Sequence, residues 1–201
     1  MITIIDYGMG NLRSVSKALE HLGAACEITS DPERVAGAER LILPGVGAFG
    51  DAMAELERRG LVPAIKRYVA GGRPMLGICL GMQVLMDASE EAPGVAGLGL
   101  IPGMVRRFRT SLKVPHMGWN GVRQIAAAPL FRGIADGEHF YFVHSYYCDP
   151  DAAGADAVAG RTDYALDFPS VLWRGNILAT QFHPEKSQRI GLKMLENFAG
   201  L

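Results

Sequence analysis

The chain has 201 residues, of which 49% are hydrophobic, and this length suits one domain with a sizeable buried core. Its 20 lysine and arginine residues against 21 acidic residues leave a net charge of -1, which gives no strong field to attract nucleic acid or an anionic membrane. We therefore expect partners to be recognised by shape and local chemistry.

The N-terminus and the cysteines bear on the cellular compartment. Met1 leads directly into an apolar run, without the basic segment of a signal peptide. The apolar stretch 92–105 is broken by prolines and glycines and is too short to span a bilayer. The three cysteines form no C-x-x-C pair, which fits neither a disulfide framework nor a zinc site. These features predict a cytoplasmic chain with no membrane segment and no metal.

In chain order, the first half alternates short apolar runs with helical patterns. The runs are residues 2–6, 41–43 and 75–78, and the helical patterns are residues 12–22, about 50–68, and 82–86. Glycine-containing turns separate each run from the helix that follows. This alternation predicts a parallel sheet with crossover helices, whose ligands bind at the carboxyl ends of the strands. The turn at 8–10 is too short to be a dinucleotide fingerprint, so we expect no cofactor.

The second half contains short strand candidates joined by turns. They are residues 104–108, 121–124, 140–143, 171–174 and 176–180. Residues 174–176 predict a hairpin turn, and a helical pattern returns only after Pro184. The predicted fold is therefore a single α/β domain over residues 1–201, with a mostly parallel central sheet flanked by helices and an added antiparallel strand region.

Cys79 is a candidate nucleophile. It follows the apolar run 75–78, lies between Gly77 and Gly81, and precedes a helical pattern, which is the strand-turn-helix context of a nucleophile elbow. At a helix N-terminus the positive end of the dipole favours a thiolate, and the N–H of Leu80 would face a developing oxyanion. The alternative is a small buried cysteine packed beneath a helix.

His183 is the candidate base for this nucleophile. It follows the last strand candidate, so it can approach Cys79 across the sheet, and imidazole titrates in the range that proton transfer requires. Glu185 can orient the ring through the other nitrogen, as the acid of a triad does. The alternative is a surface histidine beside a Pro-Glu pair that starts a helix.

Two segments together resemble the class I glutamine amidotransferases: G-I-C-L-G-M-Q at residues 77–83 and Q-F-H-P-E-K-S at residues 181–187. The resemblance implies that Cys79 attacks the side-chain amide of glutamine, that His183 acts as base and then as acid, and that Glu185 orients His183. It further implies a glutamyl thioester that water hydrolyses, with glutamate and ammonia as products.

Four other segments resemble the glutaminase subunits of imidazole glycerol phosphate synthases, which act in histidine biosynthesis. They are D-Y-G-M-G-N-L at 6–12, L-P-G-V-G-A-F-G at 43–50, P-H-M-G-W-N at 115–120 and F-V-H-S-Y at 142–146. This resemblance covers essentially the whole chain. It implies a heterodimer with a barrel-shaped cyclase subunit, which receives ammonia through a tunnel.

The resemblance also assigns three groups of residues. The implied oxyanion hole comprises Val46, Gly47 and Leu80. The implied glutamine-binding residues are Gly47, Gln83, Glu91, Ser145 and Tyr146, with Glu91 meeting the substrate amino group. The implied docking face for the cyclase comprises Asn11, His116, Trp119, Asn120 and Lys186.

Several of these assignments have plain structural alternatives. Residues 44–47 are also consistent with an ordinary strand-to-helix turn, the run 89–91 with a solvated helix end, and Trp119 with a core position. The chain as a whole could instead be a glutaminase of another synthase, such as pyridoxal phosphate synthase, a non-catalytic module on the same fold, or a cysteine peptidase or stress protein with a similar elbow.

Overall fold

The centre of the structure is an eight-stranded sheet with strand order β2-β1-β3-β4-β13-β12-β11-β8. The computed structural model describes residues 1–201. β2, β1, β3, β4 and β13 are mutually parallel, and β12, β11 and β8 continue the sheet in antiparallel fashion. The bounds are β1 (Ile2–Ile5), β2 (Cys26–Thr29), β3 (Arg40–Gly45), β4 (Met75–Cys79), β8 (Arg123–Gln124), β11 (Val158–Tyr164), β12 (Leu166–Arg174) and β13 (Ile177–Thr180).

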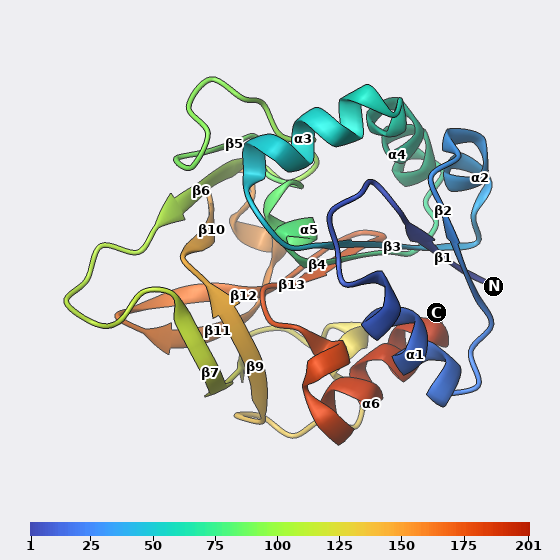
Figure 1. Ribbon diagram of the computed structural model, residues 1–201. Helices are drawn as coiled ribbons and strands as arrows, with labels where there is room; N and C mark the ends of the chain where they lie inside the picture. The colour runs from blue at the N-terminus through green and yellow to red at the C-terminus, as the bar shows by residue number, and fades with distance from the viewer.

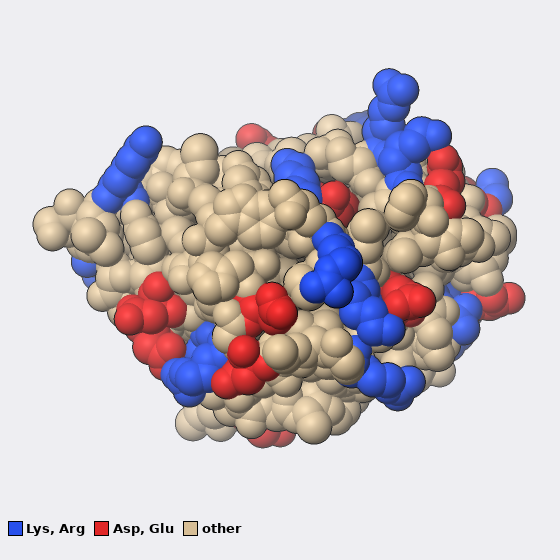
Figure 2. All heavy atoms as spheres, turned by 90° about the horizontal axis from the view of Figure 1, so that it is seen from below, with Lys and Arg blue, Asp and Glu red and all other residues tan.

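Helices cover both faces of this sheet (Figure 1). On one face lie α2 (Pro32–Gly37), α3 (Phe49–Arg58) and α4 (Leu61–Ala70), and on the other lie α1 (Leu12–His21) and α6 (Gln188–Ala199). None of these helices combines the length and the apolar character needed to cross a membrane. Acidic and basic side chains are interspersed on the face shown in Figure 2, in keeping with the net charge near zero.

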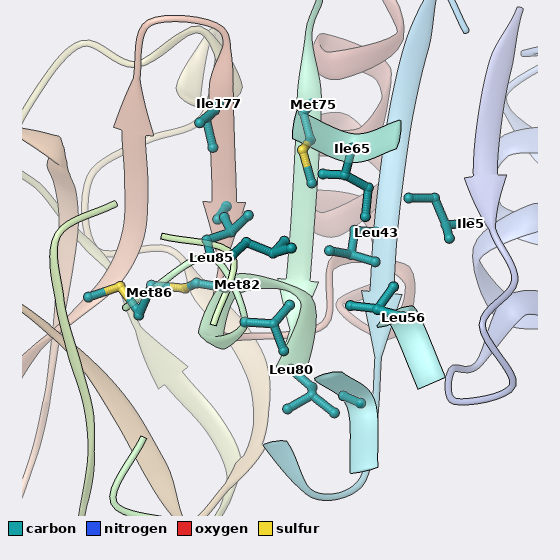
Figure 3. Packing of buried hydrophobic residues seen from close by; sticks show 14 of the residues in the cluster. Ile5, Leu43, Leu56, Ile65, Met75, Leu80, Met82, Leu85, Met86 and Ile177 are labelled. Carbon is teal, nitrogen blue, oxygen red and sulfur yellow. The ribbon is translucent and has the colours of Figure 1, made fainter. Parts of the chain in front are cut away.

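The strand side chains divide between two hydrophobic clusters, one on each face. In β3, Leu41 and Leu43 belong to the cluster with α3 and α4, whereas Ile42 belongs to the cluster with α1 and α6. This is the alternation expected of a strand that is buried on both sides. Figure 3 shows Leu43 and Met75 of neighbouring strands on the same side as Leu56 and Ile65 of the helices.

Two small sheets extend the central one at its antiparallel side. One has the order β10-β6-β5, with β5 (Ala88–Ser89), β6 (Gly103–Arg107) and β10 (Tyr146–Pro150); the other pairs β7 (His116–Gly121) with β9 (His139–His144). Single turns complete the structure: α5 (Leu80–Gln83) and the 3-10 turns Pro129–Phe131, Ala155–Ala157 and Pro184–Lys186. The expected fold class, a mostly parallel sheet flanked by helices with an antiparallel addition, is confirmed.

Two helix predictions are wrong in detail. The pattern at 50–68 is two helices, because Gly60 takes a left-handed conformation with φ of 68° and ends the first one. The helix expected through Met86 ends at Gln83. Its next carbonyls, those of Val84 and Leu85, accept hydrogen bonds from Leu98 and Leu100 instead of continuing a helix.

Five strands were not predicted: β2, β5, β7, β10 and β11. β2 has little buried surface, with only Thr29 buried, and β10 and β11 mix charged and apolar residues without regular alternation. Their partners in the sheets supply the hydrogen bonds that make these segments strands. The predicted hairpin at 174–176 is confirmed, since β12 pairs antiparallel with β13 across Gly175, whose φ is 59°.

Candidate active site

Cys79 is the last residue of β4 and lies immediately before α5. Its φ of 56° and ψ of −110° place a non-glycine residue in a strained backbone conformation, as expected for a nucleophile elbow. The flanking glycines make the turn possible. A Cβ on Gly81 would overlap the carbonyl of Leu43, and one on Gly77 would lie 2.7 Å from the carbonyl oxygen of Gly81.

The helix after Cys79 differs from the sequence expectation in length. α5 has four residues, so it supplies the free N–H groups of one helical turn and little macrodipole. Leu80 is its first residue, and its N–H therefore has no carbonyl partner within α5. The helix therefore contributes less electrostatic stabilisation of negative charge beside Cys79 than the sequence predicted.

His183 reaches the same edge of the sheet from β13. β13 lies parallel to β4 with Thr180 opposite Ile78, so residues 181–183 leave β13 where Cys79 leaves β4. The histidine is only 1% exposed, which rules out the surface alternative. Its Nδ1 lies 2.8 Å from Oε1 of Glu185, whose side chain is also 1% exposed. Because a carboxylate only accepts, Nδ1 carries the proton.

The other ring nitrogen of His183 is available for chemistry. Nε2 is buried and has no hydrogen-bond partner within the protein. Burial acts to lower the pKa of His183, but interactions with Cys79 and with Glu185 outweigh it and raise that pKa above its ordinary value. The environment thus favours the protonated, imidazolium form of His183.

Cys79 and His183 line one cavity of about 370 Å³, within the size range of small-ligand sites. All five residues expected to bind glutamine also line it. The full lining is Val46, Gly47, Cys79, Leu80, Gln83, Glu91, Pro115, Val143, His144, Ser145, Tyr146 and His183.

The loop after β3 forms one wall of this cavity. β3 and β4 pair with Gly45 directly opposite Cys79, so Val46 and Gly47 follow beside the nucleophile. Gly45 is closely packed: a Cβ there would overlap the hydroxyl of Tyr7 and lie 2.9 Å from Cβ of Leu80. Gly47 has φ of 107°, which favours glycine. The residues expected to form the oxyanion hole, Val46, Gly47 and Leu80, therefore all border the cavity.

Two polar side chains in the cavity wall are held by other parts of the protein. Oε2 of Glu91 accepts a hydrogen bond of 2.8 Å from the N–H of Phe49, the first residue of α3. The solvated helix end considered for Glu91 is therefore wrong. Nε2 of Gln83 donates to the carbonyl of Tyr146 at 3.0 Å and to Oε1 of Gln181 at 3.2 Å, which leaves Oε1 of Gln83 as its remaining acceptor.

The residues expected on a docking face lie outside the cavity, and four of the five reach solvent. Trp119 is 47% exposed, so the core alternative for it is wrong. Lys186 is exposed, and Asn11 and Asn120 are half-buried. His116 requires a correction: it is only 3% exposed, because it packs between aromatic rings of this chain, and its side chain cannot itself be a surface contact.

Three residues close to Cys79 or its pocket were not singled out from the sequence. Nε2 of Gln181 lies 3.9 Å from Sγ of Cys79, in reach of a weak hydrogen bond, and Gln181 is fully buried. His144 lines the cavity, and the hydroxyl of Tyr7 is buried without a partner. Gln181 belongs to the Q-F-H-P-E segment, so the motif contained a signal, but no spacing rule assigns a role to Tyr7 or His144.

Known proteins are similar to this chain in sequence, and others are similar to it in fold. The model of the family described as glutamine amidotransferase class-I matches residues 3–200. The chain belongs to the class I glutamine amidotransferases. It is similar to a protein of Moorella thermoacetica named imidazole glycerol phosphate synthase subunit HisH, with 55% identity over all of this chain and 94% of that protein. A protein of the same name from Syntrophotalea carbinolica is 52% identical over the full length of both chains.

Solved structures share the fold of this amidotransferase. One chain of PurLQS from Thermotoga maritima matches 99% of it with a TM-score of 0.77 and 20% identity, over 97% of its own length. A crystal structure described as a glutamine amidotransferase matches it over the full length of both chains, with a TM-score of 0.75 and 22% identity. At this identity the likeness shows the fold alone.

Proposed function

We propose that this amidotransferase is the glutaminase subunit of an imidazole glycerol phosphate synthase. The observation that carries the proposal is one cavity lined by a strained cysteine elbow and by His183, whose Nδ1 pairs with the buried carboxylate of Glu185. The choice of synthase rests on the full-length relatives, which are named as HisH subunits at 52% and 55% identity.

In the proposed reaction, the thiolate of Cys79 attacks the side-chain carbonyl carbon of glutamine and forms a tetrahedral intermediate. His183 transfers its Nε2 proton to the departing nitrogen, the C–N bond breaks, and ammonia leaves a glutamyl thioester. His183 then takes a proton from water, the hydroxide attacks the thioester, and glutamate is released. The sulfur leaves as thiolate, so glutamine and water are consumed and glutamate and ammonia are formed.

Glu185 and the cavity walls have separate roles in this scheme. Glu185 keeps the proton of His183 on Nδ1 and stabilises the imidazolium. The N–H of Leu80, joined by an N–H of the 46–47 loop once that loop is reoriented, would bind the oxyanion. Glu91 would meet the ammonium group of glutamine, while Gln83, Ser145 and Tyr146 would contact the rest of the substrate.

The proposal includes a cyclase subunit with a barrel fold, which forms a heterodimer with this chain in the cytoplasm and receives the ammonia through a tunnel. There the ammonia would be combined with a ribonucleotide intermediate to yield imidazole glycerol phosphate and an aminoimidazole carboxamide ribonucleotide. The elements that carry or adjoin Asn11, Trp119, Asn120 and Lys186 are connected in space, since β7 contacts β9, β9 contacts the 184–186 turn, and that turn contacts α1. This connection supports a shared docking face. Exchange of Trp119 for Ala should weaken cyclase binding, whereas exchange of Trp173 on β12, outside that side, should leave binding unchanged.

The direct test is glutamate release from glutamine by this chain alone, with the cyclase subunit, and with the cyclase plus its ribonucleotide ligand. We expect a strong rise only in the last mixture and no release by Cys79→Ala. Cys26→Ala is the matched control, because Cys26 is half-buried and distant from the cavity, and it should retain full activity. Full activity in Cys79→Ala would refute the assignment of the nucleophile.

Two rivals remain as outcomes of this test. A glutaminase that serves pyridoxal phosphate synthase would release glutamate with that synthase and not with the cyclase. A non-catalytic module would release none with any partner, although folded. Neither rival is favoured by a feature of the cavity, and the full-length HisH relatives support the histidine-pathway partner.

A further inference from the structure

We propose that His116 and His144 are positioning residues for glutamine binding. With Asn120 and the carbonyl of Tyr146, they form one buried hydrogen-bond chain that runs from the proposed docking face to the wall of the glutamine cavity. This inference rests on the proposed function, since it names what holds residues 145–146 in place.

The hydrogen-bond chain consists of two hydrogen bonds between side chains and one to a backbone carbonyl. Nδ2 of Asn120 lies 3.2 Å from Nε2 of His116, Nδ1 of His116 lies 2.9 Å from Nε2 of His144, and Nδ1 of His144 lies 2.7 Å from the carbonyl oxygen of Tyr146. The two histidines are 3% and 5% exposed. They lie directly opposite each other in the β7–β9 pair, so the sheet register itself brings them together.

Only one placement of protons satisfies the chain with neutral rings. The carbonyl of Tyr146 only accepts, so Nδ1 of His144 must carry hydrogen, and Nε2 of His144 is then an acceptor. His116 must donate to it from Nδ1, which leaves Nε2 of His116 to accept from the amide of Asn120. Burial lowers the pKa of both histidines, which agrees with neutral rings. Every link therefore has a fixed direction.

The rings are also fixed sterically. His116 stacks on Tyr164 at 4.0 Å and on Phe142 at 4.9 Å between ring centroids. His144 packs against Phe108 and Phe168 at 5.3 and 5.2 Å. A ring held in this way cannot flip to present its other nitrogen. The hydrogen-bond chain therefore couples the position of Asn120 to the position of the Tyr146 carbonyl.

The carbonyl at the end of the chain is also tied to the nucleophile. It accepts a second hydrogen bond from Nε2 of Gln83, which also donates to Gln181, and Gln181 in turn approaches Sγ of Cys79. The carbonyl of Tyr146 is therefore clamped between His144 on the docking side and Gln83 on the catalytic side.

The clamped segment needs such support. Ser145 lies between the end of β9 and the start of β10 and belongs to neither strand, and its backbone is otherwise held by one hydrogen bond, from the N–H of Phe108 to its carbonyl at 3.1 Å. Ser145 and Tyr146 both line the glutamine cavity. Loss of the donor from His144 should therefore displace the surface that glutamine contacts and weaken its binding.

The first experiment measures KM and kcat for glutamine in the complex with saturating cyclase and its ribonucleotide ligand. His144→Phe preserves the ring but removes the donor, and we expect KM to rise roughly tenfold with a smaller change in kcat. His144→Asn places an amide N–H where Nδ1 stood, so it should recover most of the loss. His139→Phe, on the exposed side of the same strand, is the control and should leave KM unchanged.

The far end of the chain supplies a test that does not touch the cavity. Asn120→Ala should raise KM in the wild-type background and should have no further effect in the His116→Phe background, because the chain is already broken there. Additive effects of the two changes, or an unchanged KM in folded His144→Phe, would overturn the proposal. If His144→Phe does not fold, the Asn120→Ala comparison and the His144→Asn variant decide the question.

A second measurement is independent of activity. Long-range proton–nitrogen spectra of the isolated chain should show both His116 and His144 as neutral rings protonated at Nδ1, whereas free histidine prefers Nε2. An Nε2-protonated or charged His144 would overturn the proposal. If the wild-type complex releases no glutamate, the proposed function fails, and these spectra still decide whether the ordered chain exists.

Discussion

Replacement of Glu185 by Gln tests how the His183–Glu185 pair supports the chemistry. The 2.8 Å contact between Nδ1 of His183 and Oε1 of Glu185 is almost fully buried, and Glu185 is the hydrogen-bond partner of Nδ1. Gln has the same size and can still accept from Nδ1, so the variant removes the negative charge but leaves the packing intact. A charge-assisted hydrogen bond exceeds a neutral one by about 1–2 kcal/mol.

That difference sets the expected magnitude. If the charge acts on the transition state, a loss of about 1–2 kcal/mol lowers kcat/KM roughly 5- to 30-fold. Glu185→Ala also leaves a buried N–H without a partner, and its cost of about 3 kcal/mol lowers kcat/KM roughly 100-fold or more. A larger loss of kcat/KM in Glu185→Ala than in Glu185→Gln is as informative as the size of either loss.

The pH profile supplies a second, independent reading. Glu185 is one of the causes that raise the pKa of His183, so its neutralisation lowers that pKa. The imidazolium that protonates the leaving ammonia is then lost at a lower pH, and the alkaline limb of kcat/KM should move to lower pH. A carboxylate that only filled space would not move this limb.

The assay is glutamate release in the cyclase complex across a range of pH, with folding checked by thermal unfolding. Glu196→Gln is the control, because Glu196 is an exposed residue of α6 that pairs only with Lys193 and should behave as wild type. A Glu185→Gln enzyme within threefold of wild type, with an unmoved alkaline limb, would refute the role assigned to the pair.

Three further changes test other parts of the site. Gly45→Ala should destabilise the protein by about 1–3 kcal/mol and reduce glutamate release, because its Cβ would overlap the Tyr7 hydroxyl beside the nucleophile, whereas Gly37→Ala, with open space around it, should cost little in urea unfolding. Tyr7→Phe should raise the free energy of unfolding by about 1 kcal/mol, since it removes a buried hydroxyl that has no partner; a loss of stability would contradict this account. Glu91→Gln keeps an acceptor for the α3 N-terminus but loses its charge, so KM for glutamine should rise roughly tenfold, while Glu90→Gln, whose carboxylate binds the backbone of β6 outside the cavity, should leave KM unchanged.

The parallel half of the fold was open to prediction because its strands are buried on both faces. Residues 41–43 and 75–78 are continuous apolar runs that end at glycine or cysteine turns, and both became central strands. The helix boundaries were harder to predict from the sequence. A helical pattern continues through Gly60 without interruption, and only the left-handed conformation of that glycine in the folded chain divides it.

The site was predictable where the sequence concentrates its chemistry in short segments. Glycines beside Cys79 and the placement of Glu185 two residues after His183 indicate an elbow and an oriented base. The burial of His116 was not predictable, since it depends on aromatic rings that come from residues 142 and 164. Met117 and Trp119, close to it in sequence, are both exposed. His116 is buried because successive side chains of a strand point to opposite faces.

The sequence by itself determined the class of chemistry, because a nucleophile elbow and an oriented histidine are each encoded within a few adjacent residues. Only the tertiary structure decided how those groups meet. β13 lies next to β4 and runs parallel to it, although about a hundred residues separate them, and that pairing brings His183 to Cys79. The hydrogen-bond chain from Asn120 to Tyr146 likewise depends on the register of β7 with β9. A short sequence segment can indicate a functional residue whose role depends on adjacent residues. Contacts between strands that are distant in sequence depend on the packing of the whole fold, so a short segment cannot predict them.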